Sequence, residues 1–552
     1  MKALLWLCPF LVLAAQAPDK QAKQAKQDGA RIVDLSLLVA AEYPCTWPAG
    51  FPLFQINPYI KIGPLSAYNS DILAIDGNTG TQLDAPPHSI PRPGIDSPLA
   101  GPAGSMYTEK IPAWQFAGEA CVIDTRELLD KGANGHSSLV PKSLIEDWEK
   151  HHRALRFGDV AMFFSGYTDK YYKPFPAGRR FVDDPLEGKS PAWPDPDPEA
   201  MAYVASRGVM TAATDSTSMG PIPDLADPTH IAGLKHGMIW TESVTGIGQL
   251  PATGAFYCML GPKYVGAIAS EARAFAVIGE PLAGKLIDSA RNRRAADLSV
   301  TMTADLPIWW PGAGVGNNRQ PFLTINFQHM PALDNDQQIH MFDSHSGTHL
   351  VPPAYALPVT GFDNRTYAPE VRQWLTEYEK QYGARGTSDV TVEKVPLAQT
   401  QGWARVIDVK APEISAAEIQ KFEEKHGALK AGEIVIFRSG YSDVCMQGTA
   451  ATNNCMSDAL NGKREGWPAP GPEAILYLAK KGIRAVGTDG PTLGGVDPKR
   501  ALMTYWALGT KGMVAIEYLT SLSALPEAAY FIFAPIKIRG AHGGPGRAIA
   551  LY

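Results

Sequence analysis

Two stretches decide how the rest of this sequence is interpreted: Asn78-Thr-Gly-Thr-Gln-Leu-Asp-Ala-Pro-Pro-His88 and, much later, His345-Ser-Gly-Thr-His-Leu-Val-Pro-Pro-Ala-Tyr355. Aligned on Gly-Thr, the first stretch keeps an aspartate (Asp84) and a final histidine, and the second keeps two leading histidines. Together the two copies spell H-x-G-T-H-x-D-x-P-x-H. Imidazole and carboxylate groups at such close spacing are ligands that divalent metals use, so each copy is a candidate metal site.

Further landmarks repeat in the same order along the chain. Three pairs of segments match: Gly158–Asp169 with Gly432–Asp443, Trp193–Glu199 with Trp467–Glu473, and Thr214-Asp215 with Thr488-Asp489. Each pair is separated by 274 residues (432 − 158, 467 − 193 and 488 − 214). Chance similarity would not keep one spacing over three landmarks, and the period is far too long for a solenoid. The sequence therefore predicts two whole domains fused in tandem.

The length of the chain agrees with two domains, because 552 residues are too many for one hydrophobic core. The chain turns polar and basic near residues 284–296, and similar segments open the two units, Arg31–Ser36 and Arg294–Ser299. We predict one domain over residues 30–285 and a second copy of it over residues 286–552, preceded by a signal peptide over residues 1–17 and a mobile leader over residues 18–29.

The first residues are typical of an export signal. Lys2 precedes an apolar run, Ala3–Ala15, which is too short to span a bilayer, and Ala15-Gln-Ala17 fits a small-x-small cleavage pattern. We expect a periplasmic or secreted protein with no stable membrane span after cleavage. An uncleaved membrane anchor is the alternative interpretation of the same run.

An oxidising compartment changes how the cysteines are interpreted. Cys445 and Cys455 flank a short polar loop and are the natural disulfide pair. Cys45, Cys121 and Cys258 are expected to be buried thiols. No C-x-x-C occurs, which disfavours zinc ribbons and redox dithiols.

Overall composition excludes some classes of function. Hydrophobic residues make up 45% of the chain and charged residues 19%, as in folded soluble proteins. A formal net charge of −6 gives no electrostatic reason to expect a nucleic acid as partner. The 52 glycines and 46 prolines favour a loop-rich α/β protein over a helical bundle.

The repeated segments also predict local structure. Short apolar runs after a Gly-acidic turn indicate buried strands at Val160–Phe164 and Val435–Phe437. Proline in the first turn and helical spacing indicate helices at Pro198–Ser206 and Pro472–Lys480. Strands are expected next, at Val209–Ala213 and Ile483–Gly487. They lead into Asp215 and Asp489, which we expect to cap or brace strands. The motifs belong on strand-to-loop transitions, because Gly-Thr and Pro-Pro both break helices.

The motif, the later Ser-Gly-Tyr-x-Asp, the Thr-Asp pair and a histidine twelve residues before a glutamate resemble the metal-dependent cyclase family, which includes kynurenine formamidase and isatin hydrolase. The resemblance covers nearly all of the mature chain, once per half. It implies an α/β fold that is a tandem duplication of a swivelling β/β/α cyclase-type domain, packed as an internal pseudo-dimer. It also implies assembly into homo-oligomers and a divalent metal, Zn²⁺ or Mn²⁺, used to hydrolyse amides or cyclic amides.

In the first half, the resemblance gives four candidate metal ligands, two carboxylates and two imidazoles: Asp84, His88, His230 and Glu242. In family members with two metals, the matching positions form one of two subsites. Asn78 and Gln82 replace the imidazoles of the other subsite, and their amide oxygens are weak ligands.

In the second half, the candidate ligands are His345, His349 and Glu517, a set that catalytic zinc sites use with one position left for water. Three other motif positions have changed: Val351 replaces the aspartate, Tyr355 the last histidine, and Tyr505 the residue that matches His230.

The implied chemistry is metal-assisted hydrolysis, in which the cation polarises the substrate carbonyl and activates water. His88 is the candidate catalytic residue, either as a ligand or as the acid–base group that moves a proton to the leaving atom. In the second half only Tyr355 occupies this position, and a phenol with a pKa near ~10 is a poor proton shuttle at neutral pH.

The leading hypothesis is an exported hydrolase of a carbon–nitrogen bond in a small amide or cyclic amide, with aromatic molecules among the candidates. Three alternatives stay open. The protein could hydrolyse lactones with the same residues. It could be a catalytically degenerate protein that binds a small molecule without turnover. One half could also catalyse while the other braces it and lends it lid residues.

Overall fold

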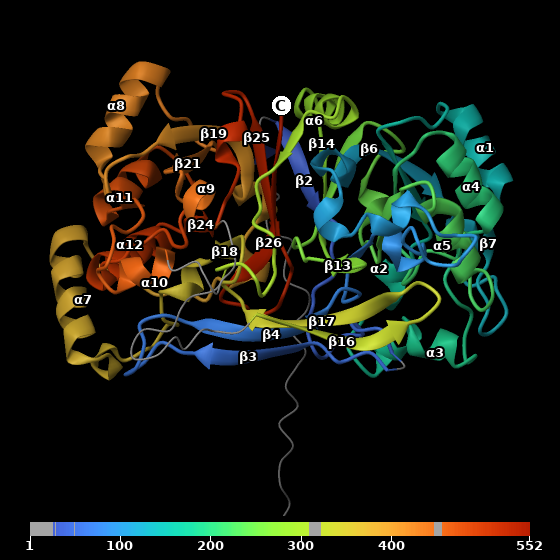
Figure 1. Ribbon diagram of the computed structural model, residues 1–552, viewed down its shortest axis with the longest axis horizontal. Coiled ribbons are helices and arrows are strands. Elements are labelled where there is room, and N and C mark those ends of the chain that lie inside the picture. Colours follow the sequence, from blue (N-terminus) through green and yellow to red (C-terminus); the bar gives the residue numbers. More distant parts are fainter. Residues whose placement is uncertain (1–25, 28, 49, 309–321, 447–454) are drawn as a thin grey trace, which may run out of the picture.

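The computed structural model describes residues 26–27, 29–48, 50–308, 322–446 and 455–552. Three main sheets carry the fold within these ranges: one belongs to each half of the chain, and the third combines strands of both halves. The two large sheets meet in the middle of the molecule, with helices on their outer sides (Figure 1). The predicted α/β fold with two copies of one domain is therefore confirmed. The signal peptide and nearly all of the leader lie outside the described residues.

The sheet of the first half has ten strands. In spatial order these are β1 (Lys26–Gln27), β2 (Ala30–Asp34), β14 (Arg273–Ile278), β12 (Ala255–Leu260), β6 (Ala117–Asp124), β8 (Asp159–Phe164), β10 (Thr211–Thr214), β11 (Ile239–Glu242), β5 (Gln82–Asp84) and β13 (Ala269–Glu271). The strands from β6 to β11 run parallel, and β5, which holds the first motif, pairs antiparallel to β11.

The sheet of the second half has eight strands. In spatial order these are β15 (Ala295–Asp297), β26 (Gly544–Leu551), β18 (His349–Val351), β24 (Val514–Glu517), β23 (Ala485–Thr488), β21 (Ile434–Arg438), β19 (Gln401–Asp408) and β25 (Tyr530–Pro535). Its order β19-β21-β23-β24-β18 repeats the order β6-β8-β10-β11-β5, again with a parallel core and an antiparallel motif strand. The two halves that the sequence predicted to be copies therefore share the same strand order and direction in this part of their sheets.

The third sheet joins the halves. It holds β16 (Leu323–Met330), β17 (Asn335–Asp343), β4 (Ser70–Asp76) and β3 (Gln55–Ile60), and β17 pairs antiparallel to β4 across the duplication. In Figure 1 these four strands cross the base of both halves. Each half therefore gives one hairpin to a sheet that neither half could form alone.

A shared hydrophobic core also holds the halves together. Strands β12 and β14 of the first sheet contact β25 of the second, and one buried cluster includes Phe256 and Phe275 from the first half with Ile532 and Ile549 from the second. Removal of such apolar surface from water is the dominant favourable term in association. The two copies accordingly pack as an internal pseudo-dimer.

Helices pack on both large sheets, most of them on the faces turned away from the other half, and the last helix of the first half lies on the face turned towards it. In the first half they are α1 (Lys142–His151), α2 (Tyr167–Tyr171), α3 (Asp183–Leu186), α4 (Pro198–Ser206), α5 (Ala226–Leu234) and α6 (Leu282–Arg291). In the second half they are α7 (Pro369–Tyr382), α8 (Ala416–His426), α9 (Tyr441–Cys445), α10 (Cys455–Leu460), α11 (Pro472–Lys480) and α12 (Pro498–Thr510). In the described part of the chain, none of them combines the length and apolar character needed to cross a bilayer.

Local predictions hold closely in both halves. Helices α4 and α11 have the predicted bounds, with proline in the first turn, and the Asp197 side chain accepts a hydrogen bond from Ala200 N at the start of α4. Strands β10 and β23 begin two residues later than predicted. The reason is that Gly208 and Gly482, both at positive φ, first turn the chain out of the helix.

The cysteine predictions are confirmed. Cys445 and Cys455 form a disulfide with a Cα–Cα distance of 5.6 Å, and Cys45, Cys121 and Cys258 are buried free thiols. At the predicted junction, α6 packs on the first sheet and the chain then enters β15 of the second. The domain boundaries themselves stay a prediction.

Candidate metal centre and its counterpart

The register of one strand pair sets up the first site. Strand β5 lies antiparallel to β11, so that Gln82 is opposite Glu242 and Asp84 is opposite Trp240. Side chains alternate across a strand, which places Gln82 and Asp84 on one face. Asp84 is fully buried, and Trp240 Nε1 donates a hydrogen bond of 3.2 Å to its Oδ2. The hydrogen bond from Trp240 therefore fixes the orientation of the Asp84 carboxylate.

The proline pair then returns the chain to the site. A single 3₁₀ turn, Pro86–His88, follows β5, and His88 N donates to Ala85 O at 2.9 Å. The turn brings His88 Nε2 to 3.9 Å from Asp84 Oδ2, and the histidine side chain is 20% exposed. Of the side chains gathered here, His88 is the one with access to solvent.

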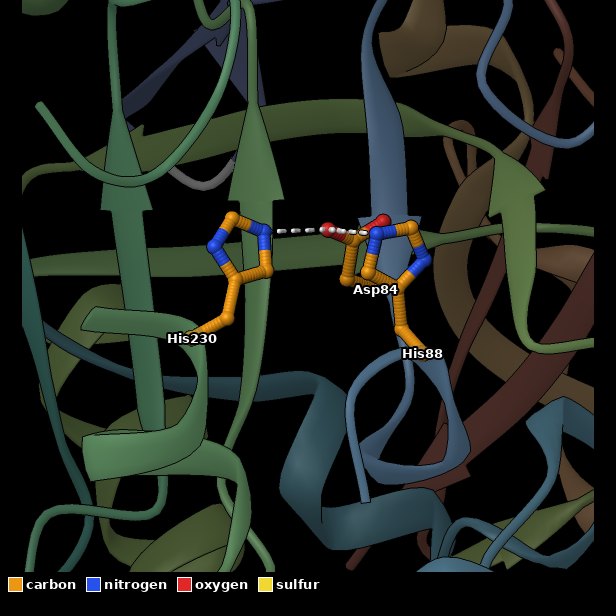
Figure 2. A group of neighbouring side chains, drawn as sticks. All are labelled: Asp84, His88 and His230. Atoms are coloured by element: carbon orange, nitrogen blue, oxygen red, sulfur yellow. Dashed lines mark ion pairs between the residues drawn. The ribbon is translucent and has the colours of Figure 1, made fainter. Parts of the chain in front are cut away.

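The third group comes from helix α5. His230 Nε2 lies 3.6 Å from Asp84 Oδ2 and 3.6 Å from Glu242 Oε1. Figure 2 shows the two imidazoles on either side of the Asp84 carboxylate. The other ring nitrogen, Nδ1, is 2.8 Å from Ala226 O, so it carries the proton and leaves Nε2 with a lone pair. A backbone carbonyl that orients a histidine in this way is the usual partner of a metal-ligating imidazole.

These three residues fit a cation. One ligand atom from each of Asp84, His88 and His230 lies within 4.8 Å of the others. A lone pair on His230 Nε2 faces carboxylate oxygens, so a proton or cation has to separate these acceptors. Asp84 Oδ1 is buried without a hydrogen-bond partner, which is costly for a carboxylate unless a positive charge is near. The unpaired Asp84 Oδ1 and the contacts of His230 Nε2 with carboxylate oxygens both favour a metal ion at this position.

Electrostatics agree with this interpretation. Burial raises the pKa of Asp84, but the neighbouring His88 and His230 outweigh it, so the pKa lies below its usual value. Burial lowers the pKa of His88, against the opposing charge of Asp84. The carboxylate is therefore ionised and the imidazole neutral near pH 7, which are the forms that bind divalent metals.

Glu242 belongs to the same cluster, but both of its carboxylate oxygens already accept hydrogen bonds. Its Oε2 accepts a hydrogen bond of 2.7 Å from Gln82 Nε2, and its Oε1 accepts one of 2.5 Å from Met219 N. Burial and then the charge of Asp84 raise its pKa well above the usual value. In this arrangement Glu242 orients Gln82 and faces His230. Its predicted role as a direct ligand stays a prediction.

The second half builds the same frame with different side chains. Strand β18 pairs antiparallel to β24, so that His349 is opposite Glu517, and His349 Nε2 lies 3.3 Å from Glu517 Oε2. The rings of His345 and His349 are 5.1 Å apart, and each Nε2 is buried without a hydrogen-bond partner. The predicted residues do meet, but the described chain contains no second cluster that matches the close grouping around Asp84.

Tyrosines take the vacated motif positions. Tyr505 occupies the place of His230, and its hydroxyl donates a hydrogen bond of 2.5 Å to Glu517 Oε1, which also accepts one from Leu493 N. Tyr355 occupies the place of His88 and packs against His345, with ring centroids 4.6 Å apart. The second-half carboxylate therefore has hydrogen-bond donors of its own.

Sequence reasoning missed the residues that cross between halves. Asn335 Nδ2, at the start of β17, donates to Pro87 O in the first motif at 2.9 Å. In the equivalent contact of the other repeat, Asn69 Nδ2 from the first half donates to Ala354 O in the second motif at 2.8 Å. Tyr68 stacks on Tyr355. No sequence signal announces these contacts, because they join residues more than 200 positions apart.

The Thr-Asp landmark that repeats in the two halves is structural, as predicted. Asp215 Oδ1 accepts from Ser165 N at 2.9 Å and Asp489 Oδ1 accepts from Ser439 N at 3.0 Å, each at the start of a short helix. Both carboxylates thereby brace the loop that follows the second parallel strand of their half.

Comparison with known proteins gives matches of one kind. The family model described as "Putative cyclase" matches residues 33–221 and again residues 296–494. The isatin hydrolase of Roseibium aggregatum is 28% identical over 206 residues, which cover 35% of this chain and 73% of that protein.

The solved structures that match cover about half of this chain. Isatin hydrolase A from Labrenzia aggregata, bound to benzyl benzoate, is 22% identical with a TM-score of 0.37, and covers 46% of this chain and 94% of its own. Isatin hydrolase A from Ralstonia solanacearum is 20% identical with a TM-score of 0.36, and covers 50% of this chain and 98% of its own. The two family matches together span more than half of the sequence, so this chain belongs to the cyclase family and carries its domain twice.

Proposed function

We propose that this protein is a divalent-metal-dependent hydrolase that cleaves a carbon–nitrogen bond in a small amide or cyclic amide, and that its first half carries the reaction. The observation that carries the proposal is the convergence of Asp84, His88 and His230 around a buried, unpaired carboxylate oxygen. The relative named isatin hydrolase supports the substrate class, because isatin is a cyclic amide.

The metal, zinc or manganese, would be held by Asp84 and His230, with His88 as a further ligand or as the acid–base group. When bound, it would polarise the substrate carbonyl and lower the pKa of a water toward ~7. The chain fixes its own groups beforehand: Trp240 holds Asp84, Ala226 O fixes the tautomer of His230, and burial keeps the His88 imidazole neutral. A neutral, partly exposed imidazole can take a proton at Nε2 and pass it to the leaving nitrogen.

Metal analysis with an activity panel tests the proposal. Purified protein would be loaded with Zn²⁺ or Mn²⁺ and assayed on aryl formamides, isatin-like lactams and lactones. We expect about one metal ion per chain and hydrolysis of at least one amide. His88→Ala distinguishes its two roles, because loss of a ligand lowers the metal content whereas loss of an acid–base group lowers kcat by roughly 10²- to 10⁴-fold with metal retained. A protein that binds no metal under any loading condition would contradict the proposal.

His345, His349 and Glu517 stay a second predicted ligand set. His345→Ala and His349→Ala test it directly. If these substitutions alone remove the metal, the second half is the catalytic one.

We also propose that the protein is exported to the periplasm or the medium, where further association of the fused chains would occur. The Cys445–Cys455 disulfide supports this, since such bonds persist mainly in oxidising compartments. Cell fractionation with N-terminal sequencing of the mature protein would test it, and a cytosolic protein with an intact N-terminus would contradict it.

A further inference from the structure

We propose that two copies of this chain associate face to face through the outer surface of the four-stranded sheet that joins the halves. We call this surface the base face. It consists of six apolar residues from three strands: Ile72, Ala74, Leu323, Ile325, Ile339 and Met341. This pairing does not depend on the proposed hydrolysis, and it gives a surface to the further association of the fused chains proposed above.

The strand register separates the two faces of this sheet, because directly opposite residues on antiparallel strands point to the same face. The inward residues of the central strands β4 and β17 are at most 1% exposed: Leu73, Ile75, His340 and Phe342. Ala74 and Met341 lie opposite each other between these positions, so they point outward. Figure 1 shows the sheet at the base of the molecule, where its outward face is turned away from the core.

The described part of the chain leaves the base face uncovered. None of its six residues belongs to a buried hydrophobic cluster, and no described helix packs closely against the four strands. Leu323 and Ile325 are 41% and 49% exposed, and the other four residues are partly exposed. Asp76 and Asp343, at the ends of the central strands, are buried and accept hydrogen bonds from the backbone of their own motifs. An exposed apolar patch of this kind marks an interaction surface.

The edges of the sheet are less suited to a partner than its face. The edge strands are β3 and β16, and each has a register shift, between Pro58 and Ile60 in β3 and between Asn326 and Gln328 in β16. Proline and bulges in an edge strand hinder the addition of another strand. A partner is therefore expected on the face and not along an edge.

The symmetry of the base face selects a second copy as the partner. Ile72 matches Ile339 and Ala74 matches Met341 at the offset of the motif, 267 residues (339 − 72, 341 − 74 and 345 − 78). Because β4 and β17 pair antiparallel, the two-fold axis that relates the halves passes through the middle of this face. Two such faces can stack about a second two-fold axis, which brings apolar residues against apolar residues in an isologous interface.

The size of the base face is sufficient for a pair of chains. The central strands have 7 and 9 residues. With ~3.3 Å per residue and ~4.8 Å between strands, four strands outline roughly 500 Å². Two stacked faces would bury about 1,000 Å², the lower limit of specific interfaces. We therefore expect a dimer in equilibrium with single chains.

Sedimentation equilibrium of the full chain tests the inference. The native protein should approach twice the mass of one chain as its concentration rises to about 100 µM, which suits an interface of this size. Met341→Glu places a charge in the middle of the face and should raise the midpoint of dimerisation at least about ten-fold, because an unpaired buried charge is costly. The matched control is Leu139→Glu on β7 (Leu139–Val140), where Leu139 is 44% exposed, and it should dimerise like the native protein. Thermal melts check that both variants fold. A native protein that stays monomeric would overturn the inference, and a dimer that survives Met341→Glu would overturn this surface but not association itself.

Cross-linking gives a second readout that does not depend on an introduced charge. Stacked sheets lie ~10 Å apart, so a bis-maleimide of that span should join two Met341→Cys chains but not two Leu139→Cys chains. The native protein controls for its other cysteines, of which Cys45, Cys121 and Cys258 are buried free thiols. Equal cross-linking of the two variants would overturn the inference. Binding of the native protein to phosphatidylcholine vesicles in place of dimerisation would assign the face to a lipid surface and would overturn it as well.

Discussion

Helix α5 in the first half and helix α12 in the second present different side chains to equivalent carboxylates. His230 faces Glu242 with a lone pair on Nε2, because its Nδ1 hydrogen already bonds Ala226 O. Tyr505 faces Glu517 with a hydroxyl and donates a hydrogen to it. A phenol brings its own proton, whereas this imidazole does not. The first site therefore needs a proton or a metal between His230 and Glu242, whereas in the second site Tyr505 supplies a donor to Glu517 Oε1. The other oxygen, Glu517 Oε2, faces His349 Nε2 at 3.3 Å.

The two motif segments also differ in their capacity to bind a cation. In the first half Asp84 ends strand β5 and His88 ends the turn that follows, and Asp84 keeps an unpaired oxygen. In the second half the matching residues are Val351 and Tyr355, which cannot hold a divalent cation as carboxylate and imidazole do. Identical strand pairing thus leaves a carboxylate oxygen of Asp84 unpaired in the first half, whereas in the second half the unpaired groups are the Nε2 atoms of His345 and His349.

The largest difference between the halves is expected from removal of one carboxylate charge. Asp84→Asn should reduce metal content to near zero and lower kcat/KM by roughly a hundred-fold or more, since even residues that only orient ligands cost 10- to 100-fold. Glu517→Gln also removes one carboxylate charge, in the second half at the position that matches Glu242, and it should have a much smaller effect on metal content because Oε1 keeps its two donors. Metal analysis and assays on folded proteins check both. An equal loss of metal from Glu517→Gln would show that the comparison is wrong.

A second experiment attempts to convert the second half into the first. Val351→Asp, Tyr355→His and Tyr505→His together restore the carboxylate and two imidazoles. The backbone frame is the same, so the metal content should rise by about one ion per chain, as expected for a complete ligand set. Mass spectrometry of metal in the triple variant measures this. No additional metal in a folded variant would mean that the frame, and not the side chains, separates the two sites.

The smallest expected difference concerns Asn335 and Asn69, whose side chains each donate a hydrogen bond to the motif of the other half. Asn335→Ala removes the hydrogen bond to Pro87 O, beside His88, and leaves a buried carbonyl unpaired, which costs about 1–3 kcal/mol of stability. Asn69→Ala makes the equivalent change at Ala354 O of the second motif. Both should lower the melting temperature similarly.

Only Asn335→Ala should also lower kcat, by a few-fold, because it alone loosens the turn that carries His88. Thermal melts and steady-state kinetics on the two variants separate these effects. Equal kinetic losses would mean that both motif turns serve the reaction.

Several elements could be predicted from the sequence because their cause is local. Proline at the first turn and a glycine after the last fixed the bounds of α4 and α11, and both Thr-Asp landmarks were predicted as braces. The short sequence separation of Cys445 and Cys455 made their disulfide predictable. The residues of the first site were identified by their motif and by the twelve-residue spacing of His230 and Glu242.

Other features could not be predicted, because nothing near them in the sequence expresses them. The four-stranded sheet pairs β4 with β17, and these strands lie in different copies of the domain. The orientation of the Asn78 amide depends on Gln337, 259 residues away. Glu517 accepts a hydrogen bond from Tyr505 because α12 packs against β24. The spacing of Tyr505 and Glu517 along the sequence does not reveal this contact.

The sequence by itself determined that this protein is two copies of one α/β domain and which residue types stand at each motif position. Those properties are local or periodic, so they can be seen without coordinates. Only the tertiary structure decided which of these side chains meet, which of their atoms already have partners, and which stay unpaired. Hydrogen-bond satisfaction depends on distances between groups that are remote along the chain, and such distances exist only once the sheets have packed.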